Sequence, residues 1–314
     1  MSEFLDKLQG YADLIDEELE KLLPPRDNYQ KVLYDAMRYS LLGGGKRVRP
    51  VLLLVSAELF GLDKETVMPF ALALEMIHTY SLIHDDLPAM DNDDYRRGRL
   101  SCHRRFDEAT AILAGDALLT YAFEVAGEGV ADLTAKAFAK WDGEAVAAYQ
   151  KILPLLAKRS GTEGMVGGQI IDLKAENNTI DEYEHDALCR MKTGCLITVP
   201  AEIAVLCAQK SGTEEGRLLT EYARAIGLAF QIKDDILDVE GDPALLGKNT
   251  GMDEADNKTT FVTLYGIDGA KTMLSDLTMR AGDNCLILKD TPGCSAESAE
   301  FLKDLARFLL ERKY

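Results

Sequence analysis

Ser81–Gly98 reads SLIHDDLPAMDNDDYRRG and joins an apolar segment to a dense acidic cluster. The cluster holds five aspartates within ten residues, namely Asp85, Asp86, Asp91, Asp93 and Asp94. Carboxylates this close repel one another unless solvent surrounds them or a cation lies between them. A charged loop explains Asp93 and Asp94 well. The adjacent Asp85 and Asp86 directly follow an apolar segment, which favours a metal site.

The segment before the acidic cluster predicts a buried helix. It begins near Thr66–Pro69 and continues through Leu72–Asp86, which is apolar on most sides, as in a central helix. Asp85 and Asp91 are six residues apart, so a regular helix would place them on opposite sides. Pro88 lies between them, and proline disturbs helices. We therefore expect the chain to turn back at Pro88, so that both carboxylates reach one site.

A second acidic cluster, Gln231–Asp238, reads QIKDDILD. On a helix Asp234 and Asp238 share one face, and Asp235 flanks them. A solvated acidic face near a helix end is one interpretation, but apolar neighbours place these carboxylates at the rim of something buried. We hypothesise that the two clusters face each other across one cavity and hold divalent metal. Oxygen ligands without His or Cys favour Mg²⁺ or Mn²⁺ over Zn²⁺, and such sites suggest a phosphorylated ligand.

The remainder of the chain is predicted to be helical almost throughout. Apolar residues recur every three or four positions from Phe4 to Leu22, and Pro24 ends this helix. A second helix ends near Leu42, and a third spans roughly Val51–Phe60. Further helices are expected at about 105–127, 131–158, 161–175, 181–191, 194–209, 213–239, 259–266, 268–288 and 295–312. No linker, repeat or period-two alternation interrupts this pattern, so we predict one all-α domain over residues 1–314, with roughly a dozen helices.

The charge balance argues against some classes of partner. The chain has 35 Lys and Arg against 53 Asp and Glu, a net charge of −18, which disfavours nucleic acid and anionic membrane surfaces. No uninterrupted apolar run approaches the roughly 20 residues that span a bilayer, and the N-terminus, MSEFLDKLQG, lacks the apolar core of a secretory signal. Six cysteines without a CxxC pair indicate inert thiols in a reducing compartment. We expect a cytoplasmic protein without a membrane span.

Basic residues gather locally within this acidic chain. Gly43–Pro50 reads GGGKRVRP, which lacks the spacing of a P-loop but offers backbone amides and three cations to a phosphate. Arg96 and Arg97 directly follow the first acidic cluster. A single basic residue is more often an ordinary surface residue, so only the combination of these residues indicates a phosphate-binding site. The remaining basic candidates are Lys192, Lys248 and Lys258.

Two histidines and a pair of glycines allow more than one interpretation. His78 lies nearly on the helical face of Asp85, whereas we expect a structural role for His84. Gly167–Gly168 lies near Asp172 in a predicted helix. This pair marks either a close crossing of two helices or a place where a ligand meets the backbone.

Taken in order, these segments resemble the polyprenyl diphosphate synthase family of trans-prenyltransferases. The resemblance covers nearly the whole chain, and the ordered set is far more specific than any single motif. Within the family, bacterial-type farnesyl diphosphate synthases are most similar, with geranylgeranyl diphosphate synthases as near relatives. The matching segments are GGGKRVRP, IHTYSLIHDDLPAMDNDDYRRG, CHRRFDEATAILAGDALL, GGQIIDL, MKTG, AFQIKDDILDVEGD, LGKNTG and NKTTFVTLYG.

The resemblance implies an all-α bundle around a deep central cavity, usually in a homodimer. It implies Mg²⁺-dependent head-to-tail condensation of isopentenyl diphosphate with dimethylallyl or geranyl diphosphate. The reaction would proceed by ionisation, condensation and elimination and would give mainly farnesyl diphosphate. Three Mg²⁺ ions are expected in each active site, with Mn²⁺ as a possible substitute.

The resemblance also implies roles for individual positions. The metal ligands would be Asp85, Asp86, Asp91, Asp234, Asp235 and Asp238. The residues that bind isopentenyl diphosphate would be Lys46, Arg49, His78 and Arg97. The residues that bind the allylic diphosphate would be Arg96, Lys192, Lys248 and Lys258. Catalysis would use Lys192, Thr193 and Gln231, the last two to stabilise the forming cation, and product length would be limited by Tyr80 and Ser81.

Three other functions are weighed against this one. A geranylgeranyl diphosphate synthase shares the motifs and differs in the length of its product. A class I terpene cyclase has one aspartate motif, a different Asn/Ser/Glu metal motif and no GGKRxRP segment. A non-catalytic subunit of a heteromeric prenyl synthase loses aspartates that are intact in this chain.

Overall fold

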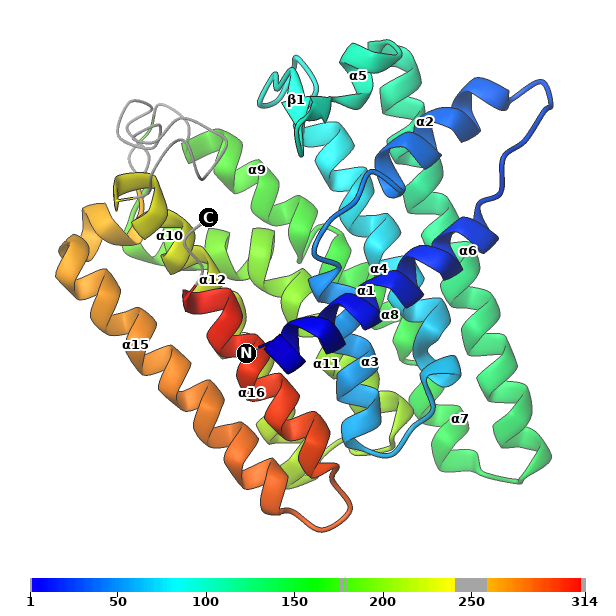
Figure 1. The fold of residues 1–314 in the computed structure, drawn as a ribbon, viewed down its shortest axis with the longest axis vertical. Helices are drawn as coiled ribbons and strands as arrows, with labels where there is room; N and C mark the ends of the chain where they lie inside the picture. Colours follow the sequence, from blue (N-terminus) through cyan, green and yellow to red (C-terminus); the bar gives the residue numbers. More distant parts are fainter. Residues whose placement is uncertain (1, 176–177, 179, 241–258, 312–314) are drawn as a thin grey trace. The chain divides into compact units, whose positions relative to one another are not determined.

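The computed structural model describes residues 2–175, 178, 180–240 and 259–311. Helices make up nearly all of these segments (Figure 1). The two strands, β1 (Tyr95–Arg96) and β2 (Arg99–Leu100), have two residues each and pair antiparallel. The predicted all-α fold is therefore confirmed, and this short hairpin is an addition that the sequence pattern did not indicate.

The chain divides into two compact units. The first unit comprises Met1–Leu54 and Asp63–Leu153, and the second comprises Val55–Leu62 and Pro154–Tyr314. Helix α3 (Val48–Leu59) begins in the first unit and ends in the second. The single domain and its central cavity stay predictions.

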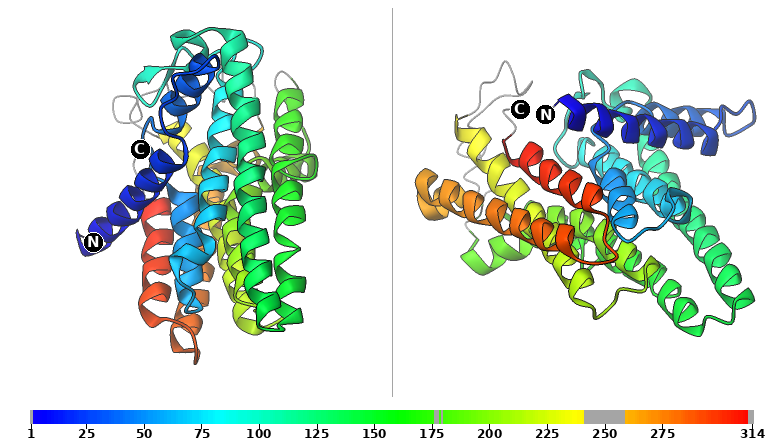
Figure 2. Two further views of the ribbon diagram at one scale, coloured as in Figure 1. Left: turned by 90° about the vertical axis from the view of Figure 1, so that its right-hand side faces the viewer. Right: turned by 60° about the horizontal axis from the view of Figure 1, so that its bottom comes forward.

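The first unit is built around helix α4 (Lys64–Asp85). Its side chains are buried along most of its length, as the apolar sequence predicted. It packs along helix α6 (Glu108–Ala139), and Figure 2 shows the two helices side by side. The other helices of this unit are α1 (Ser2–Leu22), α2 (Lys31–Leu41), α5 (Cys102–Arg105) and α7 (Gly143–Tyr149).

Two glycines of α6 explain why the predicted break near residue 127 is wrong. A Cβ atom on Gly129 would lie 2.8 Å from Pro69 Cβ, and one on Gly115 would lie 2.2 Å from His84 Nε2. The glycines thus permit close approach of α4 to an unbroken α6. The actual break follows at Trp141, whose φ is 57°, and Asp142 then caps α7 by accepting a hydrogen bond from Ala145 N at 2.9 Å.

The second unit carries the remaining helices. They are α8 (Ile152–Ser160, which begins at the boundary), α9 (Met165–Ala175), α10 (Glu182–Cys189), the π-helix η1 (Arg190–Gly194), α11 (Cys195–Cys207), α12 (Glu214–Glu240), α15 (Phe261–Asp290) and α16 (Ala296–Glu311). Ile232 and Ile236 of α12 pack with Phe261 and Ala270 of α15 in one apolar cluster. The predicted division near residue 267 is present as a kink in α15 at Gly266, whose φ is 71°.

Among the residues that the structure describes, two helices, α4 and α6, have the length and composition of a membrane span. In α4 67% of the apolar window is buried within the protein, as in the core helix of a folded unit. In α6 only 39% is buried, so this helix keeps an exposed apolar face. The absence of a membrane span stays a prediction, and the exposed face of α6 needs another explanation.

All six cysteines carry free thiols, in agreement with the sequence prediction. Five of them are buried. Burial raises the pKa of Cys207 to about 12 and also raises the pKa of Cys102. A raised pKa suppresses the reactive thiolate, so these side chains behave as small apolar residues.

Candidate active site

The end of α4 carries the first acidic motif. Asp85 is the last helical residue, and after it the chain turns back on itself. The Asp91 N–H donates to the Asp85 carbonyl at 2.9 Å, and the Asp93 N–H donates to the Asp86 carbonyl at 3.2 Å. The turn contains Pro88, as predicted. It brings Asp91 beside Asp85 although the two are six positions apart in the sequence.

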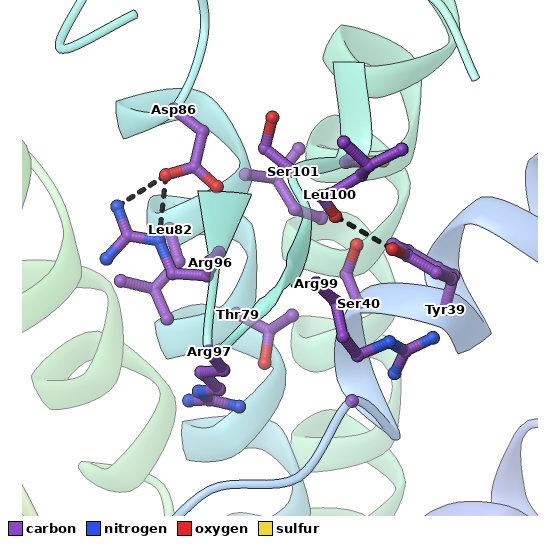
Figure 3. Close-up of a pocket in the computed structure, with 13 residues that line it drawn as sticks. Tyr39, Ser40, Thr79, Leu82, Asp86, Arg96, Arg97, Arg99, Leu100 and Ser101 are labelled. Carbon is purple, nitrogen blue, oxygen red and sulfur yellow. Dashed lines mark hydrogen bonds and ion pairs between the residues drawn. The ribbon is translucent and has the colours of Figure 1, made fainter. Parts of the chain in front are cut away.

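Asp86 behaves differently from its neighbours because it is buried, with 3% of its surface exposed. Arg96 Nε donates to Asp86 Oδ1 at 2.8 Å, and Arg96 Nη2 makes a second bond to the same oxygen (Figure 3). Burial raises the pKa of Asp86, and the Arg96 guanidinium opposes this shift. Two predicted site residues, one for metal and one for diphosphate, are therefore paired with each other.

The last two aspartates of the stretch agree with a solvated loop. Asp93 is 52% exposed and lies 3.3 Å from Arg96 Nη2. Asp94 is 54% exposed and pairs with Arg104 at 2.9 Å. Such exposed pairs contribute little free energy.

Arg96 and Arg97 point to different places although they are neighbours. Arg97 and Gly98 both have positive φ, 53° and 73°, as a two-residue turn of type I′ requires between β1 and β2. Figure 3 shows the Arg96 guanidinium against Asp86 and the Arg97 guanidinium turned away from it. Arg97 donates to the carbonyl of Gly44, in the glycine-rich segment before α3.

Arg97 belongs to a cluster of basic side chains with Arg49 and His78. Burial and, to a smaller extent, the nearby Arg97 lower the pKa of Arg49 to about 10, against the opposite effect of Glu75. Burial, then Arg49 and Arg97, hold the pKa of His78 well below its usual range. Arg49 Nε is buried without a hydrogen-bond partner among the residues that the structure describes. Mutual repulsion of this kind is relieved when an anion binds.

The same unit contains a pocket with about 410 Å³ of empty space, part of it open to solvent. Tyr39 Oη donates to the Leu100 carbonyl at 2.8 Å on one side of it (Figure 3). The buried Thr79 hydroxyl on its wall has no hydrogen-bond partner within the described part of the chain. The lining residues with charged side chains are Asp86, Arg96, Arg97 and Arg99.

The residues predicted to limit product length lie on the last turns of α4. Tyr80 is 6% exposed, and its ring meets His84 edge to face with 5.6 Å between centroids. Burial, then the charges of Asp85 and Asp116, raise the pKa of Tyr80 to about 12. Ser81 Oγ donates to the His78 carbonyl at 2.9 Å. His84 packs against Gly115, which agrees with the structural role expected for it.

In the second unit, Lys192 and Thr193 lie on the π-helix η1. Such bulges are rare and frequently occur at functional sites. A Cβ atom on Gly168 would lie 2.2 Å from Lys192 N, so Gly167–Gly168 is the close helix crossing that was one of its two interpretations. Lys192 Nζ forms an ion pair with Asp172.

Thr193 begins a chain of side-chain hydrogen bonds that runs along α12. Its hydroxyl donates to Gln231 Oε1 at 3.1 Å, and Gln231 Nε2 donates to Asp235 Oδ1 at 3.0 Å. Asp235 Oδ2 accepts from the Phe261 N–H, the first residue of α15, at 2.8 Å. Because Asp235 is only 4% exposed, it anchors this network from inside the unit.

The second acidic motif lies on an unbroken stretch of α12. Asp234 and Asp238 are therefore one turn apart on one face, as predicted. Asp234 is half-buried, and Asp238 is buried at 7% exposure. Lys248 and Lys258, predicted to bind the allylic diphosphate, lie outside the described residues.

The donor set suits a hard cation whose remaining ligands come from elsewhere. Within residues 2–175, 178, 180–240 and 259–311, no three carboxylate, imidazole or thiol groups gather into one metal site. The turn after α4 instead brings together two carboxylate residues, Asp85 and Asp91. Mg²⁺ is usually bound by one or two carboxylates, with water and phosphate oxygens completing its octahedral shell.

Several contacts at the site were not anticipated from the sequence. The sequence predicts that Arg47 is one of three cations for a phosphate, but its side chain is fully buried against Glu75. Asp172 was noted only beside the glycine pair and is the partner of Lys192. The sequence does contain a signal for the first contact, because Glu75 is a charged residue inside an apolar segment. Such a residue is rarely buried without a partner of opposite charge.

The sequence of this chain is similar to proteins of a known family. The sequence profile described as polyprenyl synthetase matches residues 30–285. A farnesyl diphosphate synthase of Haemophilus influenzae is 42% identical over 282 residues, covering 90% of this chain and 92% of that protein. A geranylgeranyl diphosphate synthase of Cyanophora paradoxa is 42% identical over 265 residues, covering 84% of each.

The solved structures give the same result. A geranyltransferase from Legionella pneumophila superposes with a TM-score of 0.83 at 33% identity, and the match covers 99% of this chain and 98% of that one. Fold, motif order and matched length agree, and the family inferred from the sequence is confirmed. The chain belongs to the polyprenyl synthetase family.

Proposed function

We propose that this protein is a Mg²⁺-dependent prenyltransferase that condenses isopentenyl diphosphate with dimethylallyl and geranyl diphosphate, giving mainly farnesyl diphosphate. The observation that carries the proposal is the cluster of Arg49, His78 and Arg97 beside the acidic turn after α4. An anion site and a carboxylate pair within one unit suit diphosphate chemistry. The farnesyl diphosphate synthases at similar length support the choice of substrates.

The cation cluster would bind isopentenyl diphosphate directly. Lys46 comes from the segment before α3, Arg49 from the first turn of α3, His78 from α4 and Arg97 from the hairpin turn. Lys46 is exposed and Arg49 is half-buried, so a ligand can reach both. Charge-assisted hydrogen bonds from these groups would hold the diphosphate without metal and direct the double bond toward the allylic partner.

The two acidic motifs would hold the metal. Asp85 and Asp91 from one motif, and Asp234 with Asp238 from the other, are the proposed direct ligands, with Asp86 and Asp235 supporting them. When bound, Mg²⁺ compensates the negative charge that develops on diphosphate as its bond to the allylic carbon breaks. Mn²⁺ is proposed as a substitute, and three ions per site follow the family resemblance.

The protein groups around the allylic diphosphate would assist the same step. Arg96 and Lys192 would contact the leaving diphosphate, and Lys248 and Lys258 are proposed for the same role. Thr193 and Gln231 present oxygen atoms from η1 and α12, and these dipoles would stabilise the allylic cation. The double bond of isopentenyl diphosphate then attacks this cation, and a proton is lost, with the released diphosphate as the proposed acceptor.

Tyr80 would limit the length of the product. Its ring is buried on α4 one to two turns before Asp85, and Ser81 lies next to it. A bulky ring there would close the space into which a growing apolar chain extends. Tyr80→Ser should therefore shift the product from C15 toward C20 or longer chains, as measured by chromatography of the dephosphorylated products. An unchanged chain length would remove Tyr80 from this role.

The incorporation of labelled isopentenyl diphosphate tests the function. The purified protein is incubated with Mg²⁺, isopentenyl diphosphate and dimethylallyl diphosphate, and the products are separated by chain length. A C15 product supports the proposal, and a C20 product indicates a geranylgeranyl diphosphate synthase. Conversion of farnesyl diphosphate alone to a hydrocarbon would indicate a terpene cyclase, and no turnover would indicate a non-catalytic subunit.

A cytoplasmic homodimer with one catalytic domain per chain completes the proposal. The exposed side of α6 presents Ile112 at 44%, Leu113 at 58% and Phe138 at 65% exposure. An apolar face of this kind is typical of a surface that a partner covers. A second copy of the chain is the proposed partner, and sedimentation equilibrium would measure its mass.

A further inference from the structure

Arg47 lies among the anion-binding residues but cannot contact a ligand. Its side chain is 0% exposed, whereas its neighbour Lys46 is exposed and Arg49 is half-buried. Its φ is 47°, an uncommon value for a residue with a side chain. Gly44 and Gly45 just before it also have positive φ, 83° and 146°. A backbone of this shape persists only when surrounding contacts hold it in place.

The Arg47 guanidinium supplies those contacts to three elements of the first unit. Nη1 donates to Glu75 Oε1 of α4 at 2.6 Å, and Nε donates to Asp16 Oδ1 of α1 at 2.8 Å. Nη2 donates to the carbonyl of Leu41, the last residue of α2, at 2.7 Å. The planar fork of arginine fits three such directions at once, and the single ammonium of lysine does not.

The position of Glu75 links this contact to the anion site. Glu75 is 2% exposed and lies three residues before His78, on the adjacent turn of α4. The bond from Arg47 therefore ties the segment with Lys46 and Arg49 to the turn that carries His78. Burial alone would lower the pKa of Arg47, but Glu75 and Asp16 outweigh it, so the buried guanidinium stays charged.

We propose that Arg47 is a positioning residue for isopentenyl diphosphate. It holds Lys46 and Arg49 in register with His78, so that the two cations and the imidazole meet one diphosphate. The inference rests on the proposed function, since it takes the identity of the anion from there. A misplacement of about 1 Å at a binding group can cost roughly 100-fold in rate. Loss of the anchor should thus weaken the binding of isopentenyl diphosphate and leave the binding of the allylic diphosphate unchanged.

The test compares the Michaelis constants of the two substrates in Arg47→Lys. The KM for isopentenyl diphosphate should rise about 10-fold or more, while the KM for geranyl diphosphate changes less than about 2-fold. Arg159→Lys is the matched control. Arg159 forms another half-buried pair, with Glu202 at 2.8 Å, in the second unit. That variant should lower the melting temperature without changing the ratio of the two KM values.

A second measurement keeps the inference independent of turnover. Isopentenyl diphosphate is titrated without metal into wild type, Arg47→Lys and Arg159→Lys, and only Arg47→Lys should bind about 10-fold more weakly. A wild type without turnover or binding would contradict the proposed function itself. An active wild type with equal changes for both substrates, or with no change in Arg47→Lys, would overturn the inference.

A milder variant covers the case in which Arg47→Lys does not fold. Asp16 is 44% exposed, so Asp16→Asn removes the negative charge from one of the three anchors at the rim of the cluster and weakens its hydrogen bond to Arg47. It should raise the KM for isopentenyl diphosphate about 2- to 3-fold and leave that for geranyl diphosphate unchanged. An unchanged KM for isopentenyl diphosphate in a folded Asp16→Asn protein would overturn the role of the anchor.

Discussion

The two acidic motifs both consist of aspartates, but their backbones have different local structures. In the first, α4 ends at Asp85 and the chain folds back, with the Asp91 N–H bonded to the Asp85 carbonyl at 2.9 Å. In the second, α12 continues without a break past Asp234 and Asp238. A turn and an uninterrupted helix can thus both gather two carboxylates. The spacing of acidic residues has to be interpreted together with the helix breakers between them.

The middle aspartate of each motif shows a second regularity. Asp86 is bonded to Arg96, and Asp235 is bonded to Gln231 and to the N–H that begins α15. Both are buried, at 3% and 4% exposure. In each motif the middle carboxylate is thus held inside its own unit by these hydrogen bonds.

The largest effect should come from the flanking aspartates. Asp85→Asn and Asp234→Asn should each lower kcat by roughly 100- to 1000-fold, because each removes charge at the point where the diphosphate leaves. Steady-state kinetics with isopentenyl and geranyl diphosphate measure this loss. Asp94→Asn, which changes an exposed aspartate paired with Arg104, is the control and should stay within about 2-fold of wild type. Near-normal turnover in either flanking variant would refute the metal assignment.

The middle aspartate of the first motif should give a smaller loss. Asp86→Asn leaves Arg96 without its carboxylate, so its guanidinium is no longer fixed and turnover should fall about 10-fold. The KM for geranyl diphosphate should rise more than that for isopentenyl diphosphate, because Arg97 keeps its own bond to Gly44. A loss as large as that of Asp85→Asn would mean that Asp86 is itself a metal ligand.

The middle aspartate of the second motif should act on stability. Asp235→Ala leaves the Phe261 N–H and Gln231 Nε2 without their acceptor in the interior, and should lower the free energy of unfolding by about 1–3 kcal/mol. Urea denaturation followed by circular dichroism measures the change. A variant as stable as wild type would show that this network contributes nothing to the fold.

The smallest effect concerns the dependence of stability on pH. Burial and the adjacent arginines hold the pKa of His78 well below its usual range. Below about pH 6.5, His78 is therefore protonated in the unfolded chain but stays neutral in the folded protein. Acidification should therefore destabilise wild type, and His78→Gln should reduce this loss. Between pH 7.5 and 5.5 the difference in melting temperature should be roughly 2 °C.

His185 of the second unit provides a comparison for the same measurement. Burial lowers its pKa, but the neighbouring Asp186 opposes the shift, in contrast to the arginines around His78. His185→Gln should therefore change the pH dependence less than His78→Gln does. Equal changes in the two variants would show that burial alone, without the cation cluster, sets the behaviour of His78.

Much of the fold was predictable because its signals are local. The apolar segment around Leu72–Asp86 predicted a buried helix, and the spacing of Asp234 and Asp238 predicted a shared helical face. The unbroken course of α6 was missed because Gly129 serves close packing against Pro69, a contact remote in sequence. A local pattern cannot distinguish that use of glycine from a helix end.

The site was predictable in its residue types and less so in its contacts. The GGGKRVRP segment indicated three cations for a phosphate, yet Arg47 is buried against Glu75 and is thereby separated from Lys46 and Arg49. The pairing of Asp86 with Arg96 depends on the hairpin turn at Arg97, whose two-residue strands leave no periodic signal. Pairings of this kind arise from tertiary geometry, which one sequence does not contain.

The central claim is that the two motifs hold one metal-bound diphosphate. Titration calorimetry with Mg²⁺ and inorganic diphosphate tests it in wild type, Asp85→Asn, Asp234→Asn and the double variant. If both motifs serve one site, each single variant should lose most of the binding, and the double variant should be little weaker than the worse single one. Losses that multiply in the double variant, or full binding in either single variant, would contradict the claim.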